Sequence, residues 1–400
     1  MAILTNWYPP HIGGSAINIH KICREHAKRH EVTVLTPQRY GGPDEEEMEG
    51  IVVKRFQNRH NPARLYPDTN MHSLCPGLFL EILQGRYDLV IAYPALTPNF
   101  QLCLLATLLN RTPIILTVFD LLDYRRFSLS QFPCPTLLEK FYREKSLAKR
   151  WVFRLQLKCC KGILGIAQTE VDFIRRFNPL VSLTPVHVDL REFEEIQRGG
   201  FKKRYSLEGK KIVLSVGRIE HHKGQDILLG VVPEIIKHAP TAYFVFVGPV
   251  TEHGYFTSIQ EMIKDLGVSE HVLFTGALTR TDVLQAFQDC DLHVAPVRFM
   301  NSGAVTQEAW AARKPAIQSN RVDPNHIEEG VDGYIFDLND PQDLSDKILL
   351  LLGDEGLRQR LGETGRRKVA ERFDYEKGIL HLEALYDRVL AGKNGAHPSF

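Results

Sequence analysis

The feature that most constrains the fold is an alternation of short, β-branched apolar segments with amphipathic helical segments along nearly the whole chain. This alternation is typical of parallel sheets whose strands are joined by crossover helices. In the first half, strands are predicted at residues 2–5, 32–35, 51–56, 89–92, 114–118 and 162–167. In the second half, they are predicted at residues 213–216, 243–247, 272–275, 292–295, 316–318 and 334–336. The sequence therefore predicts an α/β protein with two Rossmann-like, doubly wound parallel sheets, and a ligand in a cleft between the carboxyl edges of their strands.

The length of 400 residues is sufficient for two domains, each with its own core. We expect the first domain over residues 1–189 and the second over residues 190–372, followed by a final helix and tail over residues 373–400. An acidic, glycine-bearing loop is expected at residues 41–50, and the charged stretch 190–211 is interpreted as a linker. The chain closes with predicted helices at residues 343–352, 357–372 and 375–390.

Charge and cysteine content exclude several classes of protein. The formal net charge of +1 does not indicate a nucleic-acid-binding protein. The cysteines are odd in number and scattered without a C-x-x-C pair, which predicts neither a disulfide framework nor a zinc site. No apolar run reaches membrane-spanning length, and the apolar run at the start of the sequence is too short for a signal peptide. We therefore expect a cytoplasmic protein, either soluble or peripheral on the inner face of the membrane.

Two cations follow the predicted strand 213–216. Gly217 ends the strand, Arg218 follows it, and Lys223 lies five residues further on. The glycine allows close approach of a ligand, the planar guanidinium can take two phosphate oxygens, and the lysine adds a mobile charge. The pattern favours a diphosphate site, to which the histidines at 221–222 could add contacts. The alternative is a strand–loop–helix turn whose basic and histidine side chains are merely solvated.

Glycines mark two further turns that suit an anion. Gly13 and Gly14 join the first strand to the first helix, and His11 lies beside them as a candidate for the cleft. The second turn precedes a helix that we expect to begin near residue 303, with Ser302 as its N-cap. Helix N-termini present unbonded amides and a positive dipole end to anions. In the first turn the alternative is a glycine pair needed only for the backbone conformation.

Glu308 lies five residues beyond Gly303, roughly 7–8 Å along a helix axis, and its side chain leans back toward the helix start. A nucleotide whose diphosphate lies on the helix start would bring its ribose diol within reach of Glu308, which can accept both hydroxyl protons. The alternative is a solvated glutamate in the middle of a helix.

Residues 139–161 combine basic and apolar side chains. Lys149, Arg150 and Arg154 alternate with Trp151 and other apolar residues. The basic side could attract anionic lipid headgroups or a charged acceptor. An ordinary surface helix with a solvated face has the same features, so both interpretations stay open.

Motifs spread over residues 1 to about 390 together resemble those of the family 4 glycosyltransferases, which are retaining, nucleotide-sugar-dependent enzymes of the GT-B fold. The residues that carry this resemblance are Gly13-Gly14, Gly217-Arg218, Lys223-Gly224, Thr275-Gly276, Pro296 with Glu308-Ala309 twelve residues later, and Asp332-Gly333. The resemblance implies a hexosyltransferase of glycan biosynthesis that takes a nucleoside-diphosphate sugar as donor and a hydroxyl compound as acceptor.

The resemblance also implies roles for individual residues. Arg218 and Lys223 would stabilise the leaving diphosphate, and Glu308 would bind the ribose. Asp120 could orient the acceptor or a water, and the alternative for a carboxylate at a strand end is to cap the next helix. The remaining donor-binding positions would be Gly13, Gly14, Gly217, Gly248, Thr275, Gly276, Met300, Asn301, Ser302, Gly303, Ala304 and Val305. His11 and Phe119 would line the sugar or acceptor pocket. No metal or other cofactor is expected, because the cations and the helix dipole would offset the developing charge. The first domain would bind the acceptor, the second would bind the donor, and the final helix would cross back to the first domain.

Five residues depart from the family pattern. Met300 stands where a glutamate is usual, and Phe119 stands where a histidine precedes Asp120. In the family both polar groups lie against the donor sugar. Arg313 replaces a usual glycine, and residues 186–187 replace a common Asn-Gly pair.

The two apolar replacements lead to alternative hypotheses. An active enzyme would take a less polar donor sugar, such as a deoxy-hexose, because an apolar wall leaves a sugar hydroxyl unpaired at a cost of about 1–3 kcal/mol. An amino hexose is left open as a second donor sugar. Alternatively, the chain would be a pseudoenzyme or partner subunit that binds nucleotide sugar without transferring it. A sugar-nucleotide epimerase is a third possibility. Because Arg218, Lys223 and Glu308 are all retained, we favour an active transferase.

Overall fold

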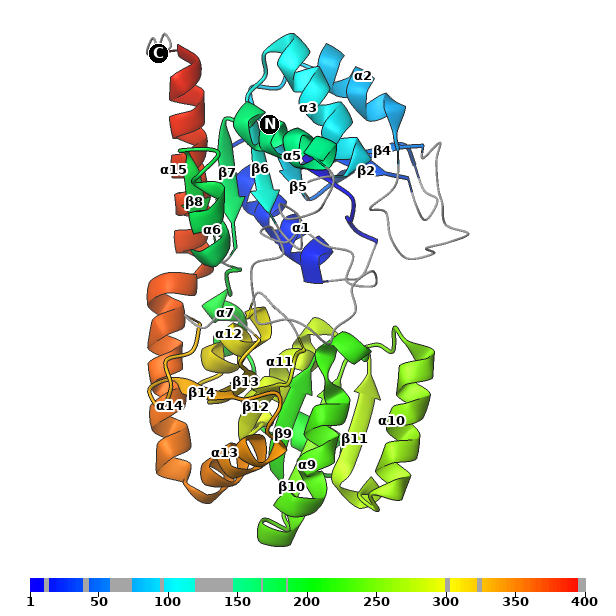
Figure 1. The fold of residues 1–400 in the computed structure, drawn as a ribbon, viewed down its shortest axis with the longest axis vertical. Coiled ribbons are helices and arrows are strands. Elements are labelled where there is room, and N and C mark those ends of the chain that lie inside the picture. The colour runs from blue at the N-terminus through cyan, green and yellow to red at the C-terminus, as the bar shows by residue number, and fades with distance from the viewer. Residues whose placement is uncertain are drawn as a thin grey trace. The chain divides into compact units, whose positions relative to one another are not determined.

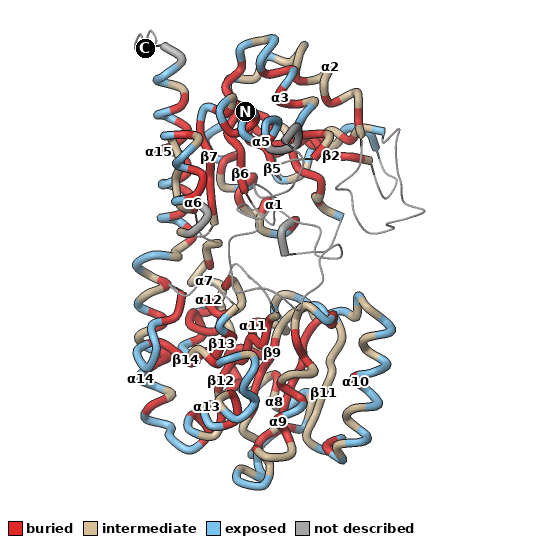
Figure 2. Tube along the Cα trace, viewed as in Figure 1, coloured by how far each residue is buried: buried red, intermediate tan, exposed pale blue. Residues whose placement is uncertain are grey.

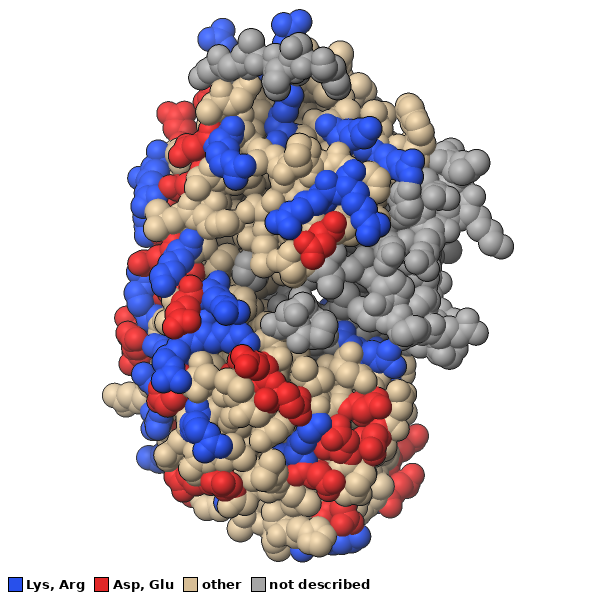
Figure 3. Space-filling model, turned by 60° about the vertical axis from the view of Figure 1, so that its left-hand side comes forward, with Lys and Arg blue, Asp and Glu red and all other residues tan. Residues whose placement is uncertain are grey.

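The computed structural model describes residues 1–10, 14–38, 43–57, 74–93, 97–118, 147–166, 168–184, 186–298, 303–321 and 326–394. These residues form two compact units, Met1–Pro185 with Ile379–Phe400, and Val186–Gly378 (Figure 1). None of the helices in the described ranges has the length and apolar content needed to cross a membrane. Basic and acidic side chains both occur on the face shown in Figure 3, as the near-neutral net charge predicts.

The first unit contains a sheet of order β3-β4-β2-β1-β5-β6-β7-β8, in which only the edge pair β3–β4 is antiparallel. Its strands are β1 Ala2–Thr5, β2 Val32–Pro37, β3 Glu45–Met48, β4 Ile51–Phe56, β5 Val90–Tyr93, β6 Ile114–Val118, β7 Gly162–Gly165 and β8 Val181–Leu183. The central strand β1 is entirely buried, and Ile3 pairs with Val34 on one side and Ile91 on the other. Strands buried on both faces read as continuous apolar runs, which explains why the sequence located them.

Helices cover both faces of this sheet. They are α1 Gly14–Ala27, α2 Pro76–Gln84, α3 Pro98–Asn110, α5 Leu147–Cys159, α6 Gln168–Ile174 and the C-terminal α15 Tyr375–Asn394. Phe100 of α3 and Phe153 of α5 are buried in one core with β7 residue Ile163. Figure 2 shows that the strands of this sheet are largely buried. The preceding residue Gly162 faces the other way, since a Cβ there would lie 3.1 Å from Val389 of α15. The two faces therefore carry different sets of helices.

The acidic segment that we expected to be a loop at residues 41–50 is instead part of a β-hairpin. Strand β3 pairs antiparallel with β4, ending in the pair Met48–Ile51. Glu49 and Gly50 both have positive φ, 51° and 78°, as a two-residue hairpin turn requires. The loop prediction was wrong because three consecutive glutamates in β3 give no alternation of apolar and polar residues. Glutamates are tolerated there because β3 is an edge strand, whose side chains can reach solvent.

The second unit contains a parallel sheet of order β11-β10-β9-β12-β13-β14. Its strands are β9 Lys211–Val216, β10 Ala242–Val247, β11 Val272–Gly276, β12 Leu292–Ala295, β13 Ala316–Ser319 and β14 Gly333–Phe336. The chain first adds strands on one side of β9 and then continues on its other side with β12. The strand order therefore reverses between β9 and β12, which is where open α/β sheets bind ligands.

The helices of the second unit begin in the stretch that we interpreted as a linker. They are α7 Leu190–Glu194, α8 Gly200–Arg204, α9 Gln225–His238, α10 His253–Asp265, α11 Arg280–Asp289, α12 Ala304–Ala311, α13 Pro341–Gly353 and α14 Glu355–Lys368. The linker interpretation was wrong, because Phe193 of α7 and Phe201 of α8 are buried in the core of this unit. A π-helical turn, Val369–Phe373, joins α14 to α15.

Helix α15 leaves the second unit at Gly378 and belongs to the first unit from Ile379 onward. There Tyr386 shares a hydrogen bond of 3.3 Å with His26 of α1, and Glu383 forms an ion pair with Arg29. The predicted fold class, two Rossmann-like units and a final helix that returns to the first, is confirmed.

Candidate functional site

The candidate site lies at the carboxyl edge of the second sheet, around the reversal between β9 and β12. Three glycines, Gly217, Gly248 and Gly276, stand at or just beyond the ends of the neighbouring strands β9, β10 and β11. The Gly248 amide donates to the Gly276 carbonyl at 3.0 Å, and a Cβ on Gly248 would lie 2.1 Å from the Gly217 carbonyl oxygen. The backbones therefore approach too closely for a side chain at residue 248, and this part of the edge is lined by main chain. The hydroxyl of the predicted donor-binding residue Thr275 donates to the Gly276 carbonyl at 2.9 Å.

The two predicted cations lie on the loop that follows β9. The Arg218 side chain is 54% exposed, and its guanidinium forms an ion pair with the Glu220 carboxylate at 2.9 Å. Glu220 is nearly buried and also accepts a hydrogen bond from the Thr251 hydroxyl at 3.1 Å. The side chain of Lys223 lies across the Gly217 backbone, since a Cβ on Gly217 would be 3.6 Å from the Lys223 Cδ. Arg218 and Lys223 are thus both held beside the glycine at the end of β9.

A second ion pair ties this loop to the segment that follows β12. The Arg298 guanidinium donates to both oxygens of Asp226, at 2.8 and 2.5 Å, and to the His221 carbonyl at 2.7 Å. The Tyr255 hydroxyl donates to Asp226 at 2.6 Å. Burial raises the pKa of Asp226, but the hydrogen bonds from Arg298 and Tyr255 outweigh burial and bring that pKa below its usual range. The carboxylate therefore stays ionised and fixes Arg298 against the loop.

Close backbone packing also joins the two loops. Gly224 has φ +70°, and a Cβ on it would lie 2.0 Å from the Pro296 carbonyl oxygen. The Arg298 amide donates to the His222 carbonyl at 3.0 Å. No larger residue fits at position 224 without separating the loop after β9 from the loop after β12.

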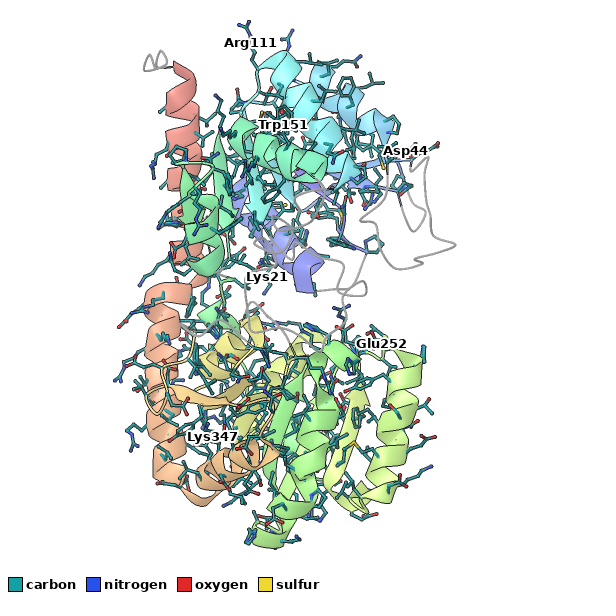
Figure 4. The ribbon with its side chains drawn as sticks, viewed as in Figure 1. Lys21, Asp44, Arg111, Trp151, Glu252 and Lys347 are labelled. Atoms are coloured by element: carbon teal, nitrogen blue, oxygen red, sulfur yellow. The ribbon has the colours of Figure 1, made fainter. Side chains whose placement is uncertain are left out.

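The histidines of this loop differ in environment. His221 is exposed, and its amide donates to the carboxylate of Glu252, which Figure 4 labels at the start of α10. Burial, together with the positive charges of Lys223 and Arg218, lowers the pKa of His222 to about 2. His222 is therefore neutral at physiological pH and adds no positive charge for a phosphate, so the charge of the loop comes from Arg218 and Lys223.

Helix α12 follows β12 along the chain, and β12 pairs with β9 in the sheet. Its N-cap is Gly303, with φ +71°, so the expectation that Ser302 caps the helix was wrong. A Cβ on Gly303 would lie 2.2 Å from the His326 ring, which explains why a glycine is needed. The helix is anchored by the fully buried Trp310, whose indole donates to the Asp332 carbonyl at 2.7 Å. The amides at the start of α12, including those of Ala304 and Val305, have no carbonyl one turn earlier within the helix and are available to an anion.

Glu308 lies on the second turn of α12 and is 19% exposed. Its carboxylate accepts a hydrogen bond from Arg280, the first residue of α11. Arg280 also donates to Glu192 of α7, at 2.7 and 3.2 Å. Glu308 is therefore a held side chain and not the solvated mid-helix glutamate that the sequence left open.

Several predicted site residues lie outside the described residues. These are His11, Gly13, Phe119, Asp120, Met300, Asn301 and Ser302. Gly14 is the first residue of α1, in the first unit. The other predicted residues all lie in the second unit, where the structure brings them to one edge of the sheet. Within the described ranges, no group of three or more His, Cys, Asp or Glu is arranged to hold a metal ion.

The sequence did not reveal Glu220, Asp226, Arg298, Arg280 and Glu192 as residues of this site. Asp226 and Arg298 are 72 residues apart, and Glu192 and Arg280 are 88 apart. Glu220 and Arg298 each follow a predicted strand closely, and this position gave a signal, because strand ends of a parallel sheet share one edge.

Two family models match the chain. The description "Glycosyl transferase 4-like domain" applies to residues 13–188, and "Glycosyl transferases group 1" applies to residues 198–368. The two matches are consecutive and together span most of the chain, one in each half.

Among curated proteins, the chain is 32% identical over 197 residues to spore coat protein SA of Bacillus subtilis. That match spans 48% of the chain and about half, 52%, of the relative. Over 403 residues it is 24% identical to the GDP-mannose-dependent alpha-(1-6)-phosphatidylinositol monomannoside mannosyltransferase of Mycolicibacterium smegmatis, covering 97% of the chain and 98% of the relative.

The fold is similar to that of Anabaena Alr3699/HepE in complex with UDP, with a TM-score of 0.74 and 17% identity over 97% of the chain and 100% of that structure. This similarity supports the GT-B fold, and the family models cover both halves of it. The chain therefore belongs to the family 4 glycosyltransferases of the GT-B fold.

Proposed function

We propose that this protein transfers a hexose from a nucleoside-diphosphate sugar to a hydroxyl acceptor, with retention of the anomeric configuration. The observation that carries the proposal is that Arg218 and Lys223 follow β9 and helix α12 follows β12, the two neighbouring strands at which the order of the second sheet reverses. Two cations and a helix N-terminus beside a glycine-lined backbone form a site for a diphosphate.

The diphosphate is bound by Arg218, Lys223 and the amides near Gly303 to Val305. As the bond from the sugar to the diphosphate breaks, negative charge builds up on the departing phosphate oxygen. The two cations and the helix dipole stabilise that charge, so the proposed transfer needs no metal. Arg218 is oriented for this role by Glu220, because the Glu220 carboxylate is itself fixed by Thr251.

In the transfer step, the acceptor oxygen forms a bond to the anomeric carbon while the bond from that carbon to the phosphate oxygen breaks. The electron pair of the broken bond goes to the diphosphate, and the acceptor hydroxyl proton passes to the departing phosphate oxygen on the same face. Retention follows from this front-face displacement without an enzymic nucleophile. Asp120 orients the acceptor in this proposal.

The sugar is proposed to be a deoxy or amino hexose. In the sequence, Met300 and Phe119 stand at the positions where the family usually has polar residues that contact the sugar. An apolar wall suits a methyl group better than a hydroxyl, which supports the deoxy hexose. The same losses motivate the competing hypothesis of a non-catalytic nucleotide-sugar-binding partner, which the donor experiment below distinguishes.

The proposed acceptors are glycans, lipid-linked saccharides or secondary metabolites, and an outward face of the first unit favours the lipid-linked class. Leu105, Leu108 and Leu109 of α3 are 50–60% exposed, and α3 packs against α5, where Trp151 and Leu155 are 66% and 45% exposed. Figure 4 labels Trp151 on α5, with Arg111 at the end of α3.

Cations accompany these apolar residues. Arg154 and Lys158 of α5 and the following Lys161 are exposed, and α5 carries no acidic residue. An aromatic and aliphatic surface with adjacent cations suits the headgroup region of an anionic bilayer. We therefore place peripheral membrane contact, proposed for the inner face, on α3 and α5.

The function is tested with a donor panel that includes GDP-mannose, UDP-glucose, UDP-N-acetylglucosamine and deoxyhexose nucleotides. Thermal shifts report donor binding, because a bound donor stabilises the folded protein by mass action. Release of nucleoside diphosphate, measured with and without acceptors, reports transfer, and NMR of the product reports its anomeric configuration. The substitution Arg218→Ala should abolish both signals. The control Arg204→Ala, which removes a similarly exposed arginine paired with Asp282, should leave them intact.

Each outcome of this panel decides between the hypotheses. Turnover of one donor with retention supports the proposal. Donor binding without turnover for any acceptor favours the partner-protein hypothesis, and rearrangement of the sugar nucleotide without an acceptor favours an epimerase. If no donor binds, the site assignment is wrong.

A further inference from the structure

Arg280 connects the proposed ribose-binding glutamate to a third helix. One terminal nitrogen of its guanidinium donates to Glu308 of α12. The other terminal nitrogen and Nε both donate to the same oxygen of Glu192, at 2.7 and 3.2 Å. The guanidinium carbon also lies 6.0 Å from the centre of the Phe193 ring. A single arginine thus joins α7, α11 and α12.

The position of Arg280 is fixed by local sequence. It is the first residue of α11, directly after the N-cap Thr279. The Thr279 hydroxyl oxygen accepts from the Asp282 amide at 3.2 Å and donates to the Asp282 carboxylate at 2.8 Å. This capped start holds the Arg280 backbone, while Glu192 and Phe193 hold its side chain.

The three charged side chains are partly shielded from solvent. The exposed fractions are 36% for Arg280, 23% for Glu192 and 19% for Glu308. A planar guanidinium bound on one edge by Glu192 presents its other terminal nitrogen to Glu308 in one direction. The carboxylate of Glu308 has two oxygens with about four acceptor positions, so a hydrogen bond to Oε1 leaves capacity for a diol.

We propose that Arg280 is a positioning residue for the ribose of the donor. It holds the Glu308 carboxylate in the orientation that accepts the 2′- and 3′-hydroxyl protons, and it offsets the negative charge of Glu308 near the diphosphate. Arg280 itself does not touch the sugar that is transferred. This inference rests on the proposed function, because it requires a nucleotide whose ribose lies at Glu308.

The alternative role for Arg280 is a structural staple between three helices. A staple would affect the stability of the protein and the affinity for every nucleotide equally. A positioning residue instead changes how much one particular hydroxyl of the ligand contributes to the binding free energy. The two roles are therefore separated by comparing ligands that differ only in that hydroxyl, measured on the same protein sample.

The experiment measures dissociation constants by calorimetry for UDP, GDP and ADP and for their 2′-deoxy counterparts. The proteins are the wild type, Arg280→Ala, Arg280→Lys and the control Arg204→Ala, whose ion pair with Asp282 also reaches α11 but not Glu308. In the wild type and the control, loss of the 2′-hydroxyl should weaken binding by about 10- to 100-fold, as expected for a hydrogen bond to a charged group. In Arg280→Ala this ratio should fall to about threefold or less, and Arg280→Lys should give an intermediate ratio.

The outcomes separate this inference from the function on which it rests. If none of the three diphosphates binds the wild type, the proposed function is wrong and the inference fails with it. If the wild type binds but does not distinguish ribose from 2′-deoxyribose, the assignment of Glu308 to the ribose is wrong. If Arg280→Ala keeps or increases the wild-type ratio, Arg280 is a staple or a competitor of the ribose, and the positioning role is overturned. Should Arg280→Ala fail to fold, Arg280→Lys carries the same comparison.

Discussion

The contact between Gly224 and Pro296 leads to a prediction about how the site is assembled. In Gly224→Ala, the new Cβ would lie 2.0 Å from the Pro296 carbonyl oxygen and 3.0 Å from a side-chain carbon of Ile227. The backbone oxygen cannot move aside as a side chain would, so the loop after β9 must separate from the loop after β12. The substitution therefore disturbs Lys223, next to Gly224, and the segment that follows β12 together.

Two contributions add to the cost of this substitution. Any residue with a Cβ at φ +70° costs roughly 1–2 kcal/mol relative to glycine. The steric displacement adds the loss of hydrogen bonds between the loops, including that from the Arg298 amide to the His222 carbonyl, each worth about 1 kcal/mol. We expect a total destabilisation of about 3–5 kcal/mol and at least a tenfold loss of nucleoside diphosphate affinity.

Gly267→Ala provides the matched control. Gly267 has φ +66°, nearly the same as Gly224, but a Cβ there would have no atom within 4 Å. It should cost only the backbone contribution, about 1–2 kcal/mol, and leave nucleotide affinity unchanged. Urea unfolding followed by circular dichroism gives the stability, and calorimetry gives the affinity. Equal effects of the two substitutions on both quantities would refute the close packing of the two loops.

Three further predictions follow from the described contacts. Burial and the nearby Lys368 lower the pKa of His326 from 6.5 to about 3, so between these pH values the unfolded chain takes up a proton that the folded chain does not. Lowering the pH from 7.5 to 5.5 should therefore reduce the free energy of unfolding by about 1.4 kcal/mol through this residue. In urea unfolding, His326→Gln should lose less stability than the wild type over this pH range, by the same amount. Arg298→Ala should weaken nucleoside diphosphate binding about tenfold or more in calorimetry, because the loop that carries Lys223 loses its contacts with Arg298; unchanged affinity would show that these contacts do not position the loop for the diphosphate. The double substitution Trp151→Ser with Leu155→Ser should reduce sedimentation with phosphatidylglycerol vesicles at low salt, whereas Leu380→Ser, also exposed at 56%, should not; absence of vesicle binding by the wild type would rule out the membrane proposal.

The core strands were predictable because strands that are buried on both faces have continuous apolar sequences. Strands β1, β6 and β12 have the residue ranges that the sequence predicts, and all three are buried along their whole length. The two errors of fold have the opposite cause. Strand β3 is an edge strand of glutamates, and α7 and α8 each bury a phenylalanine within a highly charged stretch. In both cases tertiary position, rather than local composition, decides the structure.

Glycine positions in the second unit were predictable for a related reason. Gly217, Gly248 and Gly303 follow strands or precede a helix, where the chain must turn or approach another backbone. The residues that hold the charged side chains in place were not predictable. Glu308 and Arg280 are 28 residues apart on two different helices, and no periodicity in the sequence relates them. Their meeting depends on how the helices pack above the sheet.

The most direct test is a crystal structure of the protein with whichever of UDP, GDP or ADP binds most tightly. We expect the diphosphate within hydrogen-bonding distance of Arg218, Lys223 and an amide at the start of α12, with the ribose hydroxyls on Glu308. A diphosphate bound elsewhere on the second unit, or one that leaves both cations without a contact to phosphate, would contradict the central assignment.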